Sequence, residues 1–405
     1  MTTTLEFIKG LFPPAWHHRL YLVGGTVRDL LSGVPCRDMD LTADLSGDEL
    51  CAMGFRPVEP SSGAGIYFLH HKSAGKVEVS LIGGQGGVEG ELRRRDFTAN
   101  AIAMGLDGTL YDPLNGIDCL GPKLLRACTP RSFHDDPLRI FRGFRFECNG
   151  WRMTQDTETM ITGGDWSQAF QQMPVERFSG EMRAALAGEH PGRFFEQMVR
   201  FGIGREFLPG LFLMPDIPAG PPVRHPEGDL FSHSLQVLQQ VAARSGDPLA
   251  RFCALFHDLG KLATDPEGYP GHDGHGEAGL GLAKAFCSSL RLPSAYGRAL
   301  GNVSALHTMA NRWNSLPDET KVMIAVRARR GGIDRILPLV SAADKPEGGI
   351  SAEWAETCRA AAASVQELGL GPDELAALPA GIRPVRILQA QAAYLRCRRV
   401  GGGDC

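Results

Sequence analysis

Residues 20–44 constrain the fold more strongly than any other stretch of this chain. The apolar run Leu20–Val23 predicts a buried strand that ends at Gly24–Gly25. Because glycine has no side chain, the backbone at this point can approach phosphate oxygens closely. The residues that follow, 26–31, predict a helix whose free N–H groups and Arg28 can bind a polyphosphate.

Two carboxylates follow this helix at strand spacing. A second strand is predicted over Arg37–Leu41, where alternate residues share a face, so that Asp38 and Asp40 project together. Magnesium binds through one or two carboxylates and substrate phosphates, and two such ions can hold the attacking and leaving oxygens of an in-line displacement. Taken alone, Gly24–Gly25 is more typical of an ordinary turn, and the pair Asp38 and Asp40 is more typical of a solvated strand edge. Their combination predicts Asp38 and Asp40 as catalytic, Mg²⁺-binding residues.

The complete arrangement resembles the nucleotidyltransferases of the DNA polymerase β superfamily. GGTVRD (24–29) and RDMDLT (37–42) are similar to motifs of its class II branch, which contains tRNA nucleotidyltransferases and poly(A) polymerases. The resemblance implies that Gly24, Gly25 and Arg28, together with Asp29, bind the incoming triphosphate. It also implies that the metals are held by Asp38 and Asp40.

Two later segments extend the resemblance. The strand predicted over residues 76–82 carries Glu78 where the family places a third metal-binding carboxylate; a solvent-facing acid on an edge strand is the alternative. RRDFTANA (94–101) matches the family motif RRDxxxNA. By this resemblance, phosphate and ribose would be bound by Arg94, Arg95, Asp96 and Asn100.

A basic helical segment follows, with Arg139, Arg142 and Arg145 at three-residue spacing. The same composition is typical of a solvated amphipathic helix. DDPLR (135–139), however, resembles the family motif EDxxR, whose acid and arginine read the Watson–Crick edge of the incoming base. The resemblance therefore implies that Asp136 and Arg139 recognise the base. The local basic surface suits phosphate contact, so Arg142 and Arg145 are predicted as nucleotide-binding residues. Asp135 stands where the family usually has glutamate.

A second group of metal-ligand residues begins after a Gly- and Pro-rich connector. One buried histidine is usually a satisfied core group, whereas several imidazoles and carboxylates on different helices suit a first-row metal or a magnesium-type pair. The order of these residues resembles the HD phosphohydrolase superfamily, which implies a divalent metal of unknown identity and a phosphatase or 2′,3′-cyclic phosphodiesterase activity. The residues are His233, His257, Asp258, His275, His307 and Asp344, with His272 a weaker candidate.

The resemblance covers nearly the whole chain and implies a domain order. An α/β nucleotidyltransferase head with a mixed sheet (1–124) precedes an all-α neck and body for base recognition and tRNA binding (125–210). A linker (211–228), an all-α HD phosphohydrolase domain (229–346) and a C-terminal helical tail (347–405) complete it. A chain of 405 residues is long enough for several such cores.

Composition limits the classes of protein that fit. Hydrophobic content of 43% and charged content of 22% are those of a globular protein. The net charge of −4 excludes a uniformly basic surface, so RNA contacts must come from local patches. No apolar run reaches membrane-span length and the N-terminus lacks signal-peptide features, so we expect a cytoplasmic protein without membrane contact. Ten cysteines without a Cys-x-x-Cys pair predict buried free thiols.

The resemblance to class II tRNA nucleotidyltransferases with an HD domain implies that the protein rebuilds the 3′-terminal CCA of tRNA. Its partners would be the tRNA 3′ end, CTP and ATP, with Mg²⁺ in the head; the oligomeric state is not predicted. Only the fifteen residues 79–93 separate Glu78 from Arg94, and short loops here are associated with enzymes that add CC alone. CC addition is therefore the principal alternative.

Two further alternatives are ranked lower. Poly(A) polymerases share the head motifs, but they typically carry a GRRF-type motif where this chain reads GIYFLHH (65–71), and they generally lack an HD domain. A degenerate head that only delivers RNA to the HD hydrolase conflicts with the intact GGTVRD, DMD and RRD motifs.

Overall fold

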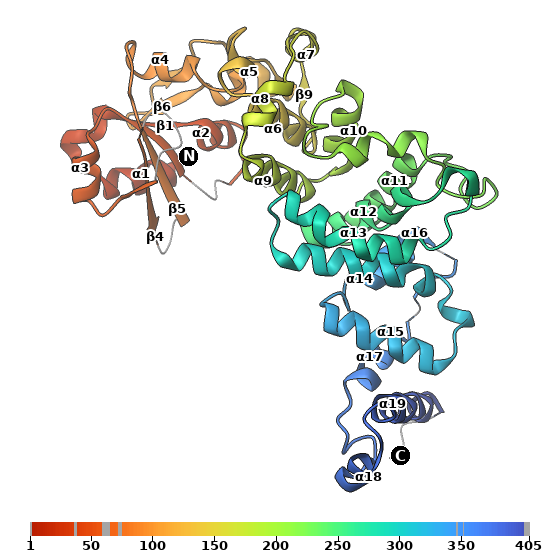
Figure 1. The fold of residues 1–405 in the computed structure, drawn as a ribbon. Coiled ribbons are helices and arrows are strands. Elements are labelled where there is room, and N and C mark those ends of the chain that lie inside the picture. The colour runs from red at the N-terminus through yellow and green to blue at the C-terminus, as the bar shows by residue number, and fades with distance from the viewer. Residues whose placement is uncertain are drawn as a thin grey trace. The chain divides into compact units, whose positions relative to one another are not determined.

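The computed structural model describes residues 2–35, 39–58, 65–71, 75–345, 347–350 and 352–400. The chain forms two compact units, Met1–Ala169 and Phe170–Cys405. The first contains the strands and the second is helical (Figure 1).

A seven-stranded mixed sheet organises the N-terminal unit, in the order β3-β4-β5-β2-β1-β6-β7. Within the described residues of this sheet, β2 and β5 pair in parallel, and the other neighbours are antiparallel. This confirms the predicted α/β head with a mixed sheet. The strands are β1 (Leu20–Val23), β2 (Met39–Ala43), β3 (Arg56–Val58), β4 (Ile66–His71), β5 (Gly75–Leu81), β6 (Ala103–Gly105) and β7 (Leu110–Tyr111).

Strand alternation separates the core from the predicted site. Met39, Leu41 and Ala43 of β2 all belong to one buried apolar cluster together with Leu22 and Val79. Because successive side chains of a strand point to opposite faces, Asp40 lies on the face away from this cluster. The apolar pattern of β2 thus places the carboxylate where a ligand can reach it.

Helices flank this sheet and extend the first unit. They are α1 (Thr2–Leu11), α2 (Gly24–Leu31), α3 (Gly47–Ala52), α4 (Gly87–Arg93), α5 (Ser132–Asp135), α6 (Leu138–Glu147) and α7 (Gln155–Thr162), and α8 (Ser167–Gln172) spans the boundary between the units. A short parallel pair, β8 (Leu124–Leu125) with β9 (Arg152–Met153), lies beside α6.

The C-terminal unit is all-α in its described residues, as predicted. Its helices are α9 (Val175–Leu186), α10 (Gly192–Phe201), α11 (Leu230–Ala242), α12 (Pro248–Phe256), α13 (His275–Ser289), α14 (Ser294–Ala310), α15 (Asp318–Gly331), α16 (Leu337–Asp344), α17 (Trp354–Ala362), α18 (Pro372–Ala377) and α19 (Arg383–Val400). A 3₁₀ segment, η6 (Leu259–Ala263), follows α12. Among the described residues, no helix combines the length and apolar character needed to cross a bilayer.

Candidate nucleotide and metal sites

The predicted phosphate-binding residues converge at the junction of β1 and α2. Gly24 adopts a φ of +61°, and a Cβ added there would lie 2.7 Å from Nη1 of Arg95 and 3.8 Å from Oδ2 of Asp40. A Cβ on Gly25 would lie 3.6 Å from Nη2 of Arg28 and 3.7 Å from Asp40 Oδ2. The glycine backbone is therefore surrounded by two guanidinium groups and a carboxylate, which suits a triphosphate with its metal.

Asp40 and Glu78 are neighbours across the parallel pair of β2 and β5. The two residues are direct register partners, so their side chains leave the same face of the sheet. The backbone N–H of Asp40 donates to the hydroxyl of Thr26 (2.8 Å), which ties the carboxylate strand to α2. Glu78 also forms an ion pair with Lys76 at 2.5 Å. The pair Asp40 and Glu78 suits magnesium; Asp38 lies outside the described residues.

Arg95 is a desolvated cation in this site. Its Nε is buried and makes no hydrogen bond within the described part of the chain. Burial lowers the pKa of the guanidinium, against the opposing charges of Glu91, Asp96 and Asp40. An anionic ligand would compensate this desolvation, as the predicted phosphate contact requires.

Asp96 connects the RRD segment to α6 through a buried network. Its Oδ2 accepts from Nε of Arg142 (2.9 Å) and its Oδ1 accepts from Nδ2 of Asn100 (3.0 Å). Burial acts to raise the pKa of Asp96, but the charge of Arg142 and the hydrogen bonds from Asn100 and Phe97 outweigh it and lower the pKa from 3.8 to about 2. Asp96 is therefore an ionised, rigidly held carboxylate.

The same network orients Arg28. Asn100 Oδ1 accepts from Nη1 of Arg28 (2.7 Å), and Asp29 accepts from its Nε (3.0 Å). The guanidinium also lies over the rings of Phe146 (5.3 Å) and Trp151 (5.8 Å). Neither aromatic residue was predicted as part of the site, because neither a ring inside an apolar helix face (Phe146) nor a single ring after the helix (Trp151) has a distinctive sequence pattern.

Arg139 is anchored by backbone carbonyls next to the RRD segment. Its guanidinium donates to the carbonyls of Arg94 (2.6 Å), Arg95 (3.3 Å) and Ser132 (3.1 Å). These contacts place the predicted base-reading arginine beside the predicted phosphate-binding residues. Asp136 precedes α6, and its Oδ1 accepts from the N–H of Leu138 (3.2 Å).

Arg145 lies farther along α6, with its guanidinium 4.9 Å from the centre of the Phe146 ring. Its predicted nucleotide contact stays a prediction.

The second predicted cluster assembles from five elements of the C-terminal unit. His233 lies on α11, His257 and Asp258 lie between α12 and η6, His275 begins α13, His307 lies on α14 and Asp344 ends α16. Close packing of η6 on α13 depends on Gly260, because a Cβ there would overlap the carbonyl oxygen of His275. The glycine of HDLGK (257–261) thus allows Asp258 and His275 to meet.

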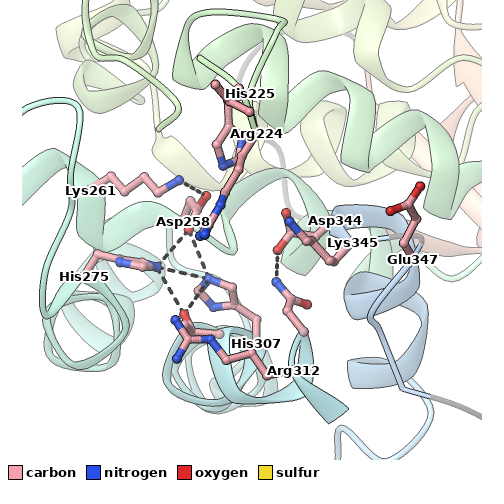
Figure 2. Close-up of a pocket in the computed structure, with 13 residues that line it drawn as sticks. Arg224, His225, Asp258, Lys261, His275, His307, Arg312, Asp344, Lys345 and Glu347 are labelled. Carbon is pink, nitrogen blue, oxygen red and sulfur yellow. Dashed lines mark hydrogen bonds and ion pairs between the residues drawn. The ribbon is translucent and has the colours of Figure 1, made fainter. Parts of the chain in front are cut away.

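All six residues fall into overlapping groups with metal-ligand spacing. Three such groups are His233–His257–Asp258, His257–His307–Asp344 and Asp258–His275–His307, each with ligand atoms within 4.8 Å of one another. Asp258 is central, because Nε2 of His257 and of His307 each lie 3.2 Å from one of its carboxylate oxygens (Figure 2 shows Asp258 with His275 and His307). This arrangement suits two divalent ions that share Asp258.

Unpaired buried atoms support a metal in this cluster. Nε2 of His233, Nε2 of His257 and Oδ1 of Asp258 are buried and make no hydrogen bond of normal geometry among the described residues. They lie 3.2 Å from other members of the cluster, so a metal ion could bind to several of them at once. Burial raises the pKa of Asp258, but His257 and Lys261 outweigh it and hold the pKa well below its usual range. The donor set is therefore a buried carboxylate with imidazole nitrogens, which fits a divalent metal.

A cavity of about 840 Å³ opens onto this cluster. Asp258, His275, His307 and Asp344 line it together with basic side chains of Arg224, Lys261, Arg312 and Lys345 (Figure 2). Cationic groups beside a metal cluster suit a phosphate-bearing ligand.

His272, the weaker candidate, lies outside the three groups above. Its ring nitrogens contact the hydroxyl of Thr264 (2.7 Å) and the carbonyl oxygen of Pro218 (2.7 Å).

Three residues near the metal cluster were not predicted from the sequence. Lys261 forms an ion pair with Asp258 at 2.7 Å, and it could have been predicted because it belongs to the HDLGK segment (257–261). His225 and Glu227 lie in the predicted linker, where no sequence pattern indicated a role in the site.

The fold and the two clusters define a two-part class: a nucleotidyltransferase-like α/β head and a helical unit with an HD-type cluster. Residues 230–346 match the family model described as "HD domain". This match contains all six predicted ligand residues.

Relatives along most of the chain identify the family. The chain is 34% identical over 338 residues to the multifunctional CCA protein of Methylococcus capsulatus, with 78% of each chain covered. It is also 34% identical over 318 residues to the multifunctional CCA protein of Nitrosococcus oceani, covering 73% of this chain and 76% of that protein. The chain belongs to the family of multifunctional CCA proteins.

Solved structures agree with this assignment. The Bacillus stearothermophilus CCA-adding enzyme in complex with CTP is 25% identical, with a TM-score of 0.64 over 93% of this chain and 88% of that chain. The Thermotoga maritima CCA-adding enzyme complexed with tRNA is 18% identical, with a TM-score of 0.60 over 93% of this chain and 87% of that chain, and supports the fold.

Proposed function

We propose that the protein adds the 3′-terminal CCA to tRNA from CTP and ATP, without a nucleic-acid template. The convergence of Gly24, Gly25, Arg28, Asp40 and Arg95 on one point is the observation that supports this function best. Because tRNA is the proposed substrate, we expect the protein to act in the cytoplasm.

The head residues have separate roles in this reaction. Arg28 and Arg95 neutralise the triphosphate, and Asp96 with Asn100 holds the ribose. Asp40, with Asp38 and Glu78, would hold magnesium, which would supply positive charge for deprotonation of the tRNA 3′-hydroxyl and for the departing pyrophosphate.

Recognition of the base is assigned to Asp136 and Arg139. An arginine can donate to a base acceptor while a carboxylate accepts from an exocyclic amine, a group that cytosine and adenine share. Three carbonyl contacts anchor Arg139, and this rigidity suits a residue that replaces a template. Arg142 acts through Asp96, and Arg145 extends the basic face of α6.

Substitution of Asp40 tests the head assignment. Asp40→Ala should lower the rate of nucleotide addition at least about 1,000-fold, because metal charge stabilises the transition state by several kcal/mol. The affinity for tRNA should change less than about threefold, since the ground-state contacts remain. Asp44→Ala, at the exposed end of the same segment, is the matched control. Near-normal turnover in Asp40→Ala would contradict the assignment.

The C-terminal unit is proposed to carry a separate metal-dependent phosphohydrolase activity. His233, His257, Asp258, His275, His307 and Asp344 would hold the divalent ions, which supply an activated water and polarise the phosphate. Arg224 and Arg312 are exposed at the cavity and would bind the phosphate oxygens. Phosphomonoesters and 2′,3′-cyclic phosphates are the proposed substrates.

His257→Ala separates the two activities. It should abolish hydrolysis of both phosphate classes across Mg²⁺, Mn²⁺, Co²⁺ and Ni²⁺, while CCA addition stays within about twofold of the unmodified protein. His190→Ala, an exposed histidine outside the cluster, is the control. Loss of both activities in a folded His257→Ala protein would indicate a shared site instead.

CC addition remains a second candidate because of the segment between Glu78 and Arg94. Most of its second half is α4, whose Val88 and Leu92 are buried, so only residues 82–86 are free of regular structure. A connector this short and well packed has little capacity to drive the rearrangement that a larger purine requires. Extension of a CC-ended tRNA by ATP distinguishes the candidates.

A further inference from the structure

One of the four histidines in the HD cluster is held differently from the other three. His257, His275 and His307 each donate Nδ1 to the backbone carbonyl three residues earlier, at 2.8, 2.6 and 2.8 Å. His233 instead has its Nδ1 2.7 Å from Oε1 of Glu227. Only this histidine among the four has a carboxylate as its Nδ1 partner in the described structure.

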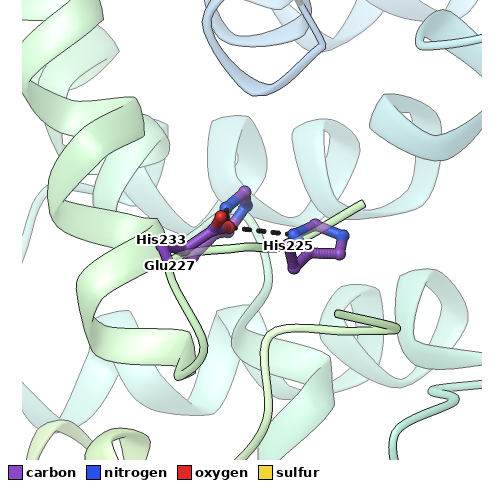
Figure 3. A group of neighbouring side chains, drawn as sticks. All are labelled: His225, Glu227 and His233. Atoms are coloured by element: carbon purple, nitrogen blue, oxygen red, sulfur yellow. Dashed lines mark hydrogen bonds and ion pairs between the residues drawn. The ribbon is translucent and has the colours of Figure 1, made fainter. Parts of the chain in front are cut away.

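Glu227 is itself fixed in place. Its side chain is 7% exposed, and the same Oε1 accepts from Nδ1 of His225 at 2.9 Å (Figure 3). The His225 ring packs against Gly220, where an added Cβ would lie 2.8 Å from Nε2.

We propose that Glu227 is a positioning residue of the HD metal centre and acts through His233. A carboxylate that accepts from Nδ1 fixes the tautomer and the ring orientation of a ligating histidine, and it increases the basicity of the other nitrogen. Here that nitrogen, Nε2, lies 3.2 Å from Asp344 and 3.7 Å from Asp258, inside the ligand cluster.

His225 completes this arrangement from the other side. It shares the Glu227 oxygen with His233 and lines the cavity beside Asp258. Glu227 and His225 both precede residue 230, where the HD family match begins. The connector before α11 therefore contributes to the metal centre. This inference rests on the proposed metal function of the C-terminal unit.

Metal affinity of the full-length protein tests the role of Glu227 without relying on turnover. Glu227→Ala should weaken Mn²⁺ binding about 10–100-fold, the range for loss of such an outer partner. Glu227→Asp keeps the charge but shortens the reach, and it should lose about as much. Glu227→Gln keeps the reach and an acceptor oxygen, so it should lose less than about tenfold. Glu206→Ala, an exposed glutamate of the same unit, should bind as the unmodified protein does.

A spectroscopic readout reports the geometry directly. The visible absorption of the Co²⁺-loaded protein should shift in Glu227→Asp and stay unchanged in Glu206→Ala, because only the former reorients a ligand. If Glu227→Ala does not fold, the Asp and Gln variants still decide the question.

Two outcomes would overturn the proposal. The first is that every folded Glu227 variant binds Mn²⁺ within twofold of the affinity of the unmodified protein. Weaker binding by Glu227→Gln than by Glu227→Asp is the other, since it would indicate charge rather than position. His257→Ala separates this result from the proposed metal function. Unchanged Mn²⁺ binding by His257→Ala would refute the metal centre itself. Loss of Mn²⁺ binding in His257→Ala, together with unchanged binding in the Glu227 variants, would refute only the positioning role.

Discussion

Removal of the Arg142 guanidinium should destabilise the N-terminal unit through Asp96. The Asp96 side chain is 7% exposed, and its pKa falls from 3.8 to about 2. At about 1.4 kcal/mol per pKa unit, the ionised carboxylate contributes about 2.5 kcal/mol to folding. Arg142 is the largest of the groups that lower this pKa, so Arg142→Met should cost about 2 kcal/mol at pH 7.

The sign of the pH dependence follows from the lowered pKa. The stabilisation is fully present above the pKa of the unfolded chain and is lost as the pH falls through the pKa of the folded protein. The cost of Arg142→Met should therefore be constant from pH 7 to pH 5 and fall to about half by pH 3.

Hydrogen exchange of amides in β6 measures this cost for the N-terminal unit alone, because the two units need not unfold together. A double-mutant cycle isolates the pair: in an Asp96→Asn background, Arg142→Met should cost less than about 1 kcal/mol. Equal costs in both backgrounds, or a cost that grows as the pH falls, would refute the reasoning.

Further predictions concern the glycine turn, the contact between Thr26 and Asp40, and the metals. Gly24→Ala should destabilise the N-terminal unit by about 1–2 kcal/mol, because φ at this position is +61°, and urea unfolding measures this cost. It should also raise the KM for CTP and ATP by displacing Arg95, which steady-state kinetics measures. An unchanged KM would contradict the proposed role of Gly24 in triphosphate binding. Thr26→Val should leave the Asp40 N–H without its 2.8 Å partner, costing about 1–3 kcal/mol, and lower kcat more than it changes KM; a kcat equal to that of the unmodified protein would contradict it. Metal chelation should lower the melting temperature of the C-terminal unit. Adding the ion back at 100 times its Kd should restore about 2.7 kcal/mol to the free energy of unfolding. A melting temperature that does not change with chelator would argue against metal binding in the HD cluster.

Local sequence patterns predicted the elements that carry the site. The apolar run Leu20–Val23 forms β1 with the predicted bounds, and α2 follows at the two glycines. Both could be predicted because an apolar run and a glycine break are local signals. The six HD residues were predicted from the resemblance of their order to the HD phosphohydrolase superfamily, and all of them meet in one cluster.

Contacts between distant segments could not be predicted in the same way. The parallel register that pairs Asp40 with Glu78 joins strands 38 residues apart, and no feature of either strand specifies it. The anchoring of Arg139 by backbone carbonyls is independent of the identity of the residues that supply them. Glu227 lies in a segment rich in Gly and Pro, which favours the interpretation of a linker, and only the folded chain brings it to His233.

Extension of defined tRNA transcripts is the most direct test of the central claim, CCA addition by this single chain. With CTP, ATP and Mg²⁺, a transcript that lacks CCA should gain all three nucleotides, and a transcript that ends in CC should gain one A from ATP alone. Asp40→Ala should do neither. Efficient C addition without A addition would contradict complete CCA synthesis and establish CC addition, and failure to extend either transcript would contradict the nucleotidyltransferase assignment.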